Sequence, residues 1–254
     1  MTNWVFSPAF QSKAAALQAL MKQWDQLGSW WVKGSRNNIK VIPFETIELS
    51  VKAFKIPNLF NAFTYKYIRK SKAKRSFEFG QYLKQQGIGT PEPIAFAEDF
   101  NWLGLAESYY ISEHLHFDFM FRDLVERPNE FAEMDQILAQ FGVFCHELHQ
   151  KGVEFLDHSP GNTLIKKSAS GFDFYLVDLN RMKFHQHMSL ACRMKNLCRL
   201  TPHEFMVRAI CNAYAQQSGE DADELFQILW QFTSQFQEAF YRKKRWKKRL
   251  RFWQ

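Results

Sequence analysis

The chain has 254 residues, of which 46% are hydrophobic and 23% charged, and a formal net charge of +7 at pH 7. This length and composition exclude a disordered protein and leave room for one large domain or two lobes with a real core. No run of about 18 apolar residues is present, so no membrane span is expected. The first 20 residues also lack the pattern of a secretion signal. Four cysteines without CxxC spacing favour reduced thiols of a cytosolic protein over a zinc site.

The first part of the chain alternates between one helix and several strands. Apolar residues at helical spacing predict a helix over 8–27, which begins near Pro8 and stops at Gly28. A strand, a polar turn and a second strand follow over 29–44 and predict a hairpin. Alternating residues predict another strand over 46–56, whereas residues 59–70 fit either a helix or a strand.

After one more helix and two strands, the rest of the chain is mainly helical. A helix is expected over 72–86, and two strands around a polar turn over 89–115. Helices follow over 117–126, 130–151 and from about 188 to the end, and two strands joined by a turn lie between them over 155–184. This order predicts an α+β protein with two lobes and a hinge near Glu113–Phe117. We therefore expect an N-lobe over 1–112, a C-lobe over 113–240 and a separate tail over 241–254.

Positive charge is concentrated in that tail. The segment YRKKRWKKRLRFWQ (241–254) has eight Lys or Arg and no acidic residue, so removing those eight charges from +7 leaves −1 for the rest. Cations interleaved with Trp and Phe favour binding to an anionic membrane surface. A nucleic-acid partner and a plain solvated helix end are the alternatives.

One loop carries residues typical of phosphoryl transfer. The stretch VEFLDHSPGNTLI (153–165) places Asp157 five residues before Asn162, and Asp178 follows at the end of the next hairpin. An aspartate can orient an acceptor hydroxyl and take its proton, while an asparagine and a second aspartate can hold Mg²⁺ through oxygen atoms. Pro160 and Gly161 fit the turn that such a loop needs.

These residues resemble the catalytic loop and metal-binding segment of the protein-kinase-like fold. Asp157 and Asn162 match the D-x-x-x-x-N spacing, and Asp178-Leu179-Asn180 lies where that fold has D-F-G. The sequence departs from protein kinases at three places: Phe155 replaces the histidine of H-R-D, Asn180 replaces the glycine, and no A-P-E segment follows. These departures disfavour a regulated protein kinase and are familiar in kinases of small molecules and sugars.

The resemblance implies further residues in the N-lobe. Lys52 would contact the α- and β-phosphates of ATP, because Ser50-Val51-Lys52 has the parity of A-I-K and Lys55 has the opposite one. Glu78, on the next helix, would hold Lys52. The nucleotide would also meet Gly34, Ser35 and Arg36 in the first turn, and backbone groups of Glu113 and Leu115 at the hinge.

One branch of this fold matches more closely. RSFEFGQYLKQQGIGTPEPIAF, DLNRMKF and MKNLCRL resemble segments of the bacterial lipopolysaccharide core kinases, which act on Kdo or heptose. The resemblance covers roughly residues 32–205 and implies ATP, Mg²⁺ and a sugar hydroxyl of the inner core, with Kdo on lipid A favoured. It places the protein on the cytoplasmic face of the inner membrane as a peripheral protein. His158, Arg181 and Lys183 are possible acceptor contacts, although packing within the loop is the favoured interpretation of His158, and Arg199 is interpreted as a structural residue.

Other functions remain open at this point. The chain could be a kinase with another sugar, small-molecule or protein acceptor. It could instead be a pseudokinase that binds nucleotide without transfer, because the histidine and the glycine-rich loop are missing. An RNA-binding module that uses the tail lacks a supporting aromatic motif, so no nucleic-acid partner is expected.

Overall fold

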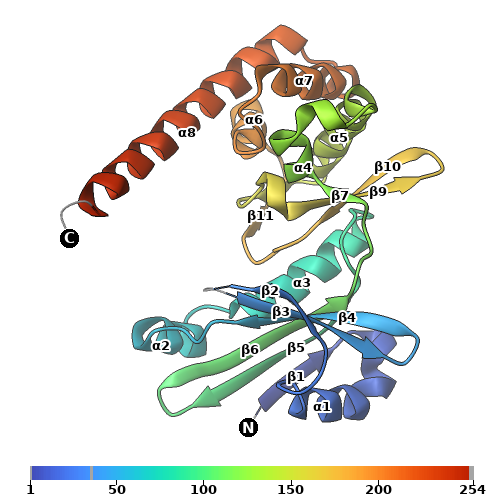
Figure 1. The fold of residues 1–254 in the computed structure, drawn as a ribbon, viewed down its shortest axis with the longest axis vertical. Coiled ribbons are helices and arrows are strands. Elements are labelled where there is room, and N and C mark those ends of the chain that lie inside the picture. The colour runs from blue at the N-terminus through green and yellow to red at the C-terminus, as the bar shows by residue number, and fades with distance from the viewer. Residues whose placement is uncertain (1, 35–36, 252–254) are drawn as a thin grey trace. The chain divides into compact units, whose positions relative to one another are not determined.

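The computed structural model describes residues 2–34 and 37–251 and divides the chain into two compact units (Figure 1). The first unit contains the residues up to His116 together with Asp178–Arg181. The second contains Phe117–Val177 and the residues from Met182 onward. Within the described residues, none of the helices has the length and hydrophobicity required to cross a membrane.

A six-stranded antiparallel sheet forms the centre of the first unit. Its strand order is β1-β5-β6-β4-β3-β2. The strands are β1 (Thr2–Phe6), β2 (Ser29–Lys33), β3 (Asn37–Phe44), β4 (Ile47–Phe54), β5 (Pro93–Asn101) and β6 (Gly104–Glu113). The helical segments are η1 (Pro8–Lys13), α1 (Ala14–Lys22), α2 (Leu59–Tyr67) and α3 (Lys72–Gln85).

Helices pack against both faces of this sheet. Strand alternation directs Leu49 and Val51 of β4 toward Leu17 of α1, in one buried cluster. Phe54, at the end of β4, lies on the other face and packs with Phe77 of α3. α3 begins at Ser71, whose side chain accepts a hydrogen bond from the Lys74 N–H at 3.0 Å.

A buried lysine fixes the segment that follows α1. Lys40 of β3 is only 2% exposed, and its Nζ donates to the carbonyl oxygens of Trp24 (2.6 Å), Asp25 (3.3 Å) and Leu27 (3.1 Å). A buried ammonium group needs such partners, because burial removes the water that would otherwise solvate it. Lys40 thus donates to carbonyl groups in the turn after α1 that would otherwise need water as a hydrogen-bond donor.

The second unit is mainly helical. Its helices are α4 (Phe121–Glu126), η2 (Pro128–Glu130), α5 (Met134–Gln150), η3 (Pro160–Asn162), α6 (Leu190–Leu197), α7 (Glu204–Ser218) and α8 (Ala222–Arg251). A three-stranded sheet contains β7 (Phe119–Met120), β9 (Thr163–Ser168) and β10 (Gly171–Leu176), and a two-stranded sheet contains β8 (Val153–Phe155) and β11 (Met182–Phe184). Phe141 of α5 and Tyr214 of α7 are fully buried in its core.

The structure corrects several predicted elements. The helix expected over 8–27 is a short 3₁₀ helix followed by α1, which ends at Lys22. Residues 2–6 form β1, which the sequence did not predict, and the ambiguous residues 59–70 contain the helix α2. The predicted tail is not separate from the C-lobe, because α8 runs without a break from Ala222 to Arg251. Residues 252–254 lie outside the described part of the chain.

Candidate functional site

Lys52 and Asp178 form an ion pair in the first unit. Lys52 lies on β4 opposite Tyr110 of β6, and its side chain is 11% exposed. Its Nζ donates to Asp178 Oδ1 at 2.7 Å and lies 5.4 Å from the centre of the Phe54 ring. Burial strengthens a charge-assisted hydrogen bond of this kind, because little water competes for it.

The backbone of Asp178 is held in an unusual conformation. Its φ is 60°, in the left-handed region that non-glycine residues rarely adopt. Asn180 Nδ2 donates to the same Oδ1 at 2.6 Å, so this oxygen accepts from two side chains. Asn180 therefore performs a role that the sequence comparison did not foresee: it fixes the carboxylate two residues before it.

Close packing under α3 fixes the neighbouring residue. Leu179 is 2% exposed, and a Cβ on Gly80 of α3 would lie 3.4 Å from its Cδ1 and 2.8 Å from Pro93 Cγ. Any larger side chain at position 80 would thus push α3 away from β5 and from Leu179. This glycine lies within RSFEFGQYL, but the sequence alone gave no indication that its lack of a side chain is required.

Glu78 does not hold Lys52, contrary to the expectation. Both of its carboxylate oxygens accept from Lys70 Nζ, at 3.0 and 2.8 Å. Lys70 lies just before the N-terminus of α3, so its long side chain extends along the first two turns of the helix to Glu78. The Lys52 ammonium is instead neutralised by Asp178.

The loop from Asp157 to Asn162 is shaped by main-chain bonds in the second unit. Asn162 Nδ2 donates to the Asp157 carbonyl oxygen at 2.8 Å, and the Asn162 N–H donates to Ser159 O at 2.9 Å. The Asn162 carbonyl oxygen accepts from the Val177 N–H at 3.0 Å. The two ends of the D-x-x-x-x-N spacing are thus connected directly, and the asparagine is also tied to the residue that precedes Asp178.

Two arginines lie against this loop. Arg199 Nη1 is 3.6 Å from Asp157 Oδ1, and its guanidinium carbon lies 5.3 Å from the centre of the Phe236 ring. The guanidinium of Arg122, on α4, packs so close to Gly161 that it occupies the space a Cβ would need there. The site accordingly carries positive charge beside Asp157, and a glycine is required at position 161 for Arg122 to approach.

A buried polar network holds the chain that leads into this loop. Asn196 of α6 donates through Nδ2 to Phe155 O at 2.8 Å, and its Oδ1 shares a hydrogen bond with His149 Nε2 at 3.2 Å. His149 Nδ1 shares a second one with Tyr214 Oη at 3.1 Å. The chain two residues before Asp157 is therefore connected through α6 to α5 and α7.

His158 is a packing residue. It is 1% exposed, its ring lies 5.5 Å from that of Phe155 and 6.0 Å from that of Phe141, and neither ring nitrogen has a hydrogen-bond partner among the described residues. Burial lowers the pKa of His158 to about 4, although nearby Asn196 acts in the opposite direction. This burial agrees with the interpretation of His158 as a loop-packing residue and not as an acceptor contact.

The segments expected to meet the nucleotide are only partly described. Gly34 donates its N–H to Asn38 Oδ1 at 3.2 Å, whereas Ser35 and Arg36 lie outside the described residues. The Glu113 N–H is already used by Glu92 O at 2.9 Å. Among the described residues, no main-chain hydrogen bond engages Leu115, so its backbone groups are the ones left for a ligand.

The two basic residues that follow Asp178 differ in their surroundings. Arg181 is exposed, and its charge, like that of Arg69, adds to the burial that lowers the pKa of Arg75. Lys183 of β11 is also exposed, and its Nζ lies 3.8 Å from Glu154 Oε2. The structure brings Arg181 next to other arginines in the first unit and pairs Lys183 with an acid in the second.

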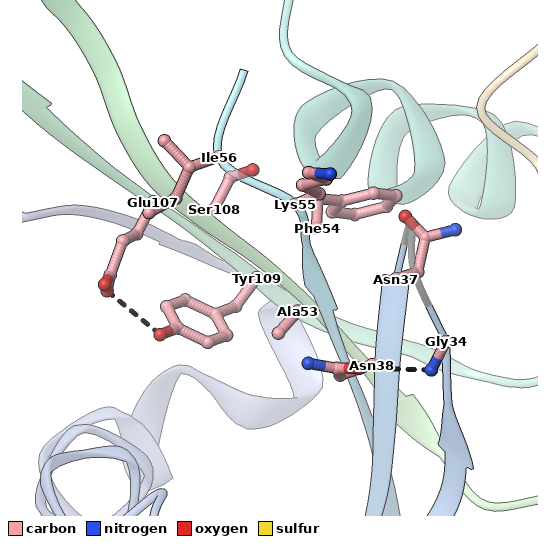
Figure 2. Close-up of a pocket in the computed structure, with 10 residues that line it drawn as sticks. All are labelled: Gly34, Asn37, Asn38, Ala53, Phe54, Lys55, Ile56, Glu107, Ser108 and Tyr109. Atoms are coloured by element: carbon pink, nitrogen blue, oxygen red, sulfur yellow. Dashed lines mark hydrogen bonds between the residues drawn. The ribbon is translucent and has the colours of Figure 1, made fainter. Parts of the chain in front are cut away.

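A cavity of about 280 Å³ lies in the first unit (Figure 2). Its lining includes Gly34, Phe54 and Lys55 but not Lys52. We therefore assign no nucleotide to it.

The donor atoms suit Mg²⁺. Asn162 uses its Nδ2 for the loop, which leaves Oδ1 as a ligand atom, and no hydrogen bond among the described residues engages Asp178 Oδ2. Hard oxygen atoms of this kind are the ligands that Mg²⁺ prefers. Both residues therefore fit the ion that the kinase resemblance implies.

Comparisons with known proteins identify the fold. No family model matches the sequence, and no curated protein matches it. Among solved structures, the chain is similar to WaaP in complex with acyl carrier protein, at a TM-score of 0.63 and 14% identity over 93% of this chain and 97% of that one. It also matches a Rio2 kinase from Chaetomium thermophilum (TM-score 0.46, 16% identity, 89% of this chain and 76% of that one) and a MAP kinase from Leishmania major (0.47, 15%, 85% and 66%). The chain has the α+β protein-kinase-like fold.

The two buried histidines predict how stability depends on pH. Burial lowers the pKa of His149 to about 3, as it lowers that of His158 to about 4. Both stay neutral in the folded chain while the unfolded chain takes up protons below about pH 6.5, so stability present above that pH is lost as the pH falls toward 4. We expect the free energy of unfolding to drop by about 1–2 kcal/mol per histidine between pH 7 and 5, measured by urea denaturation.

A substitution pair isolates this effect. His158→Leu keeps an apolar side chain between the phenyl rings and should make the pH dependence shallower by about one proton. His187→Leu, at an exposed histidine of the same unit, should leave it unchanged. An equally steep pH dependence in His158→Leu and wild type would contradict this assignment.

Proposed function

We propose that the protein is an ATP- and Mg²⁺-dependent phosphotransferase with a sugar hydroxyl as acceptor. The observation that carries the proposal is the pairing of Lys52 with Asp178, whose carboxylate Asn180 also holds. In the protein-kinase-like fold, a lysine on this strand and an acid at this position serve the phosphates and the metal. The loop from Asp157 to Asn162 supplies the remaining groups that phosphoryl transfer needs.

Lys52 serves the nucleotide side of this reaction. Its ammonium group would contact the α- and β-phosphates of bound ATP in place of Asp178. The backbone of Leu115 would meet the adenine edge, and Gly34, Ser35 and Arg36 would supply groups to the phosphates. Glu113 would contribute through groups other than its N–H, which already donates to Glu92 O.

Asn162 and Asp178 would hold the metal through their free side-chain oxygens. When bound, Mg²⁺ neutralises the charge of the β- and γ-phosphates. The left-handed backbone at Asp178, together with Asn180, sets the direction of that carboxylate before any ligand arrives. Such preorganisation lowers the cost of binding a doubly charged ion.

Asp157 orients the acceptor hydroxyl and takes its proton. Arg199, 3.6 Å from Asp157 Oδ1, would help to hold that carboxylate in position. Arg122, packed over Gly161, places a second guanidinium at the loop, where negative charge accumulates on the transferred phosphoryl group. The phosphoryl group then moves in line from ATP to the oriented hydroxyl.

The acceptor we favour is a sugar of the lipopolysaccharide inner core, Kdo on lipid A before heptose. The support is the order of the segments RSFEFGQYL, DLNRMKF and NLCRL, which resemble those of the core kinases. Arg181 and Lys183 are exposed next to the metal acid in the sequence and suit the carboxylate of Kdo. Such an acceptor places the enzyme at the cytoplasmic face of the inner membrane.

A nucleotide-binding pseudokinase is the second candidate, and one observation favours it. Glu78 is bonded to Lys70 and not to Lys52, which is an arrangement that a non-catalytic protein could retain. A kinase with another small-molecule, sugar or protein acceptor would use the same residues. The two possibilities differ in whether phosphate leaves ATP at all.

Transfer of labelled phosphate from ATP to Kdo-bearing lipid A tests the proposal. With Mg²⁺, wild type should label the lipid, and Asp157→Asn should lower the rate by at least about 100-fold, because general-base catalysis contributes about that much. Asp173→Asn, at an exposed aspartate of β10, is the matched control and should keep the wild-type rate.

Each outcome of this assay is informative. Label on heptose or another sugar rather than on Kdo would support the phosphotransferase reaction and identify a different acceptor. ATP binding without any transfer would favour the pseudokinase, and a wild-type rate in Asp157→Asn would show that the base is another residue.

We further propose that the basic end of α8 binds an anionic membrane surface. Residues 242–246 are exposed, and Trp246 among them has an exposed fraction of 63%. The C-terminal end of α8 extends beyond the other helices of its unit (Figure 1). Each cation near such a surface contributes about 1 kcal/mol, which salt screens. Phe240 and Tyr241, about half exposed, extend the aromatic side of the helix.

A truncation after Phe240 tests this surface in vesicle sedimentation. The truncated chain should bind vesicles rich in anionic lipid at least tenfold more weakly than the full chain, and the difference should shrink at high salt. A variant with Gln at positions 242–245 keeps the helix and Trp246 and should lose most of the same binding. Unchanged binding in both variants would leave α8 a solvated helix.

A further inference from the structure

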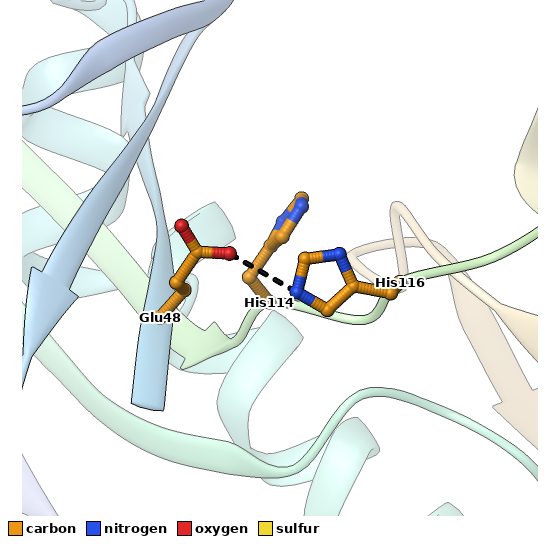
Figure 3. A group of neighbouring side chains, drawn as sticks. All are labelled: Glu48, His114 and His116. Atoms are coloured by element: carbon orange, nitrogen blue, oxygen red, sulfur yellow. Dashed lines mark ion pairs between the residues drawn. The ribbon is translucent and has the colours of Figure 1, made fainter. Parts of the chain in front are cut away.

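Three side chains with metal-binding atoms meet at the edge of the first unit, where β4 and β6 pair (Figure 3). The His114 N–H donates to Glu48 O at 2.7 Å, next to the register pair Leu49–Glu113, so Glu48 and His114 are cross-strand neighbours. His116 follows two residues later, which returns its side chain to the same side in extended chain. The proximity of the three is therefore a consequence of strand register.

The distances suit a shared ion. His116 Nε2 lies 3.1 Å from Glu48 Oε2, and one ligand atom from each of the three side chains lies within 4.8 Å of the other two. Ligands of a tetrahedral zinc ion, at about 2.0–2.1 Å from the metal, lie about 3.4 Å from one another. Small rotations of the partly exposed side chains bring the ligand atoms to that spacing.

A neighbouring hydroxyl orients one of the ligands. His114 Nδ1 and Ser50 Oγ are 2.9 Å apart, so a proton on Nδ1 donated to Ser50 leaves the lone pair on Nε2. The ring of Trp31 meets that of His114 edge to face at 5.4 Å between centres and limits its rotation.

The ligand set suits zinc. Two imidazoles and one carboxylate occur together in zinc sites, whereas Mg²⁺ and Ca²⁺ prefer oxygen atoms alone. A second group of possible ligands, Glu154, His185 and Cys192, has a lysine beside it. Lys183 Nζ lies 3.8 Å from Glu154 Oε2, and its positive charge opposes a cation there.

We propose that Glu48, His114 and His116 bind one Zn²⁺, with water as the fourth ligand. The ion would tie the start of β4 to the chain that leaves β6, which is the segment that carries Leu115. This site is separate from the Asn162 and Asp178 oxygens and does not depend on the proposed reaction.

A zinc titration of the full chain against a chromophoric chelator tests the site, in a Cys192→Ser background that removes the thiol of the other group. The parent should bind one Zn²⁺, and His116→Ala and Glu48→Gln should each weaken binding at least tenfold. His187→Ala, at an exposed histidine elsewhere, should not. His116 is 77% exposed and Glu48 41%, so neither substitution threatens folding.

A second readout supports the assignment. Zn²⁺ should raise the thermal unfolding temperature of the parent and of His187→Ala, and this shift should be absent in His116→Ala. Zinc affinity and thermal shift in His116→Ala and Glu48→Gln equal to those of His187→Ala would overturn the proposal. Loss of stoichiometric zinc binding on introduction of Cys192→Ser would overturn it as well, because it would assign the ion to the other group.

Discussion

The carboxylate of Asp178 is the point on which the candidate site depends. Its backbone adopts a left-handed conformation that costs a non-glycine residue about 1–3 kcal/mol, and it persists because the surroundings hold it. Lys52 and Asn180 both donate to Oδ1, and Leu179 is buried beneath α3 where Gly80 leaves room for it. Strain of this size is typical of functional positions, since selection for packing alone would relieve it.

The same logic of preorganisation applies to the loop in the second unit. The Asn162 side chain donates to the Asp157 carbonyl oxygen, and Asn196 anchors Phe155 just before this loop in the same way. Neutral histidines complete that support, at the expense of stability in acid. A reaction that moves a charged phosphoryl group benefits from donors and acceptors that do not need to reorganise.

Much of this arrangement was predictable from local patterns. Strand parity separated Lys52 from Lys55, and the structure places the first beside Asp178 and the second in the lining of a cavity that does not include Lys52. The pairing of Glu78 with Lys70 rather than with Lys52 was not predictable, because Lys70 reaches Glu78 through a flexible side chain whose position no periodicity encodes. The packing role favoured for His158 agrees with its burial, whereas its contact with Phe141 could not be predicted, because Phe141 lies on the separate helix α5.

Calorimetric titration of ATP, with Mg²⁺ and with a chelator of Mg²⁺, tests the central claim most directly. Wild type should bind ATP tightly only with Mg²⁺, and Asp178→Asn should lose at least tenfold in affinity, because asparagine tolerates the left-handed backbone but lacks the charge. Lys52→Met should lose a similar factor, whereas Lys55→Met should bind like wild type. Equal affinity in wild type and Asp178→Asn, or equal losses in the two lysine variants, would contradict the account.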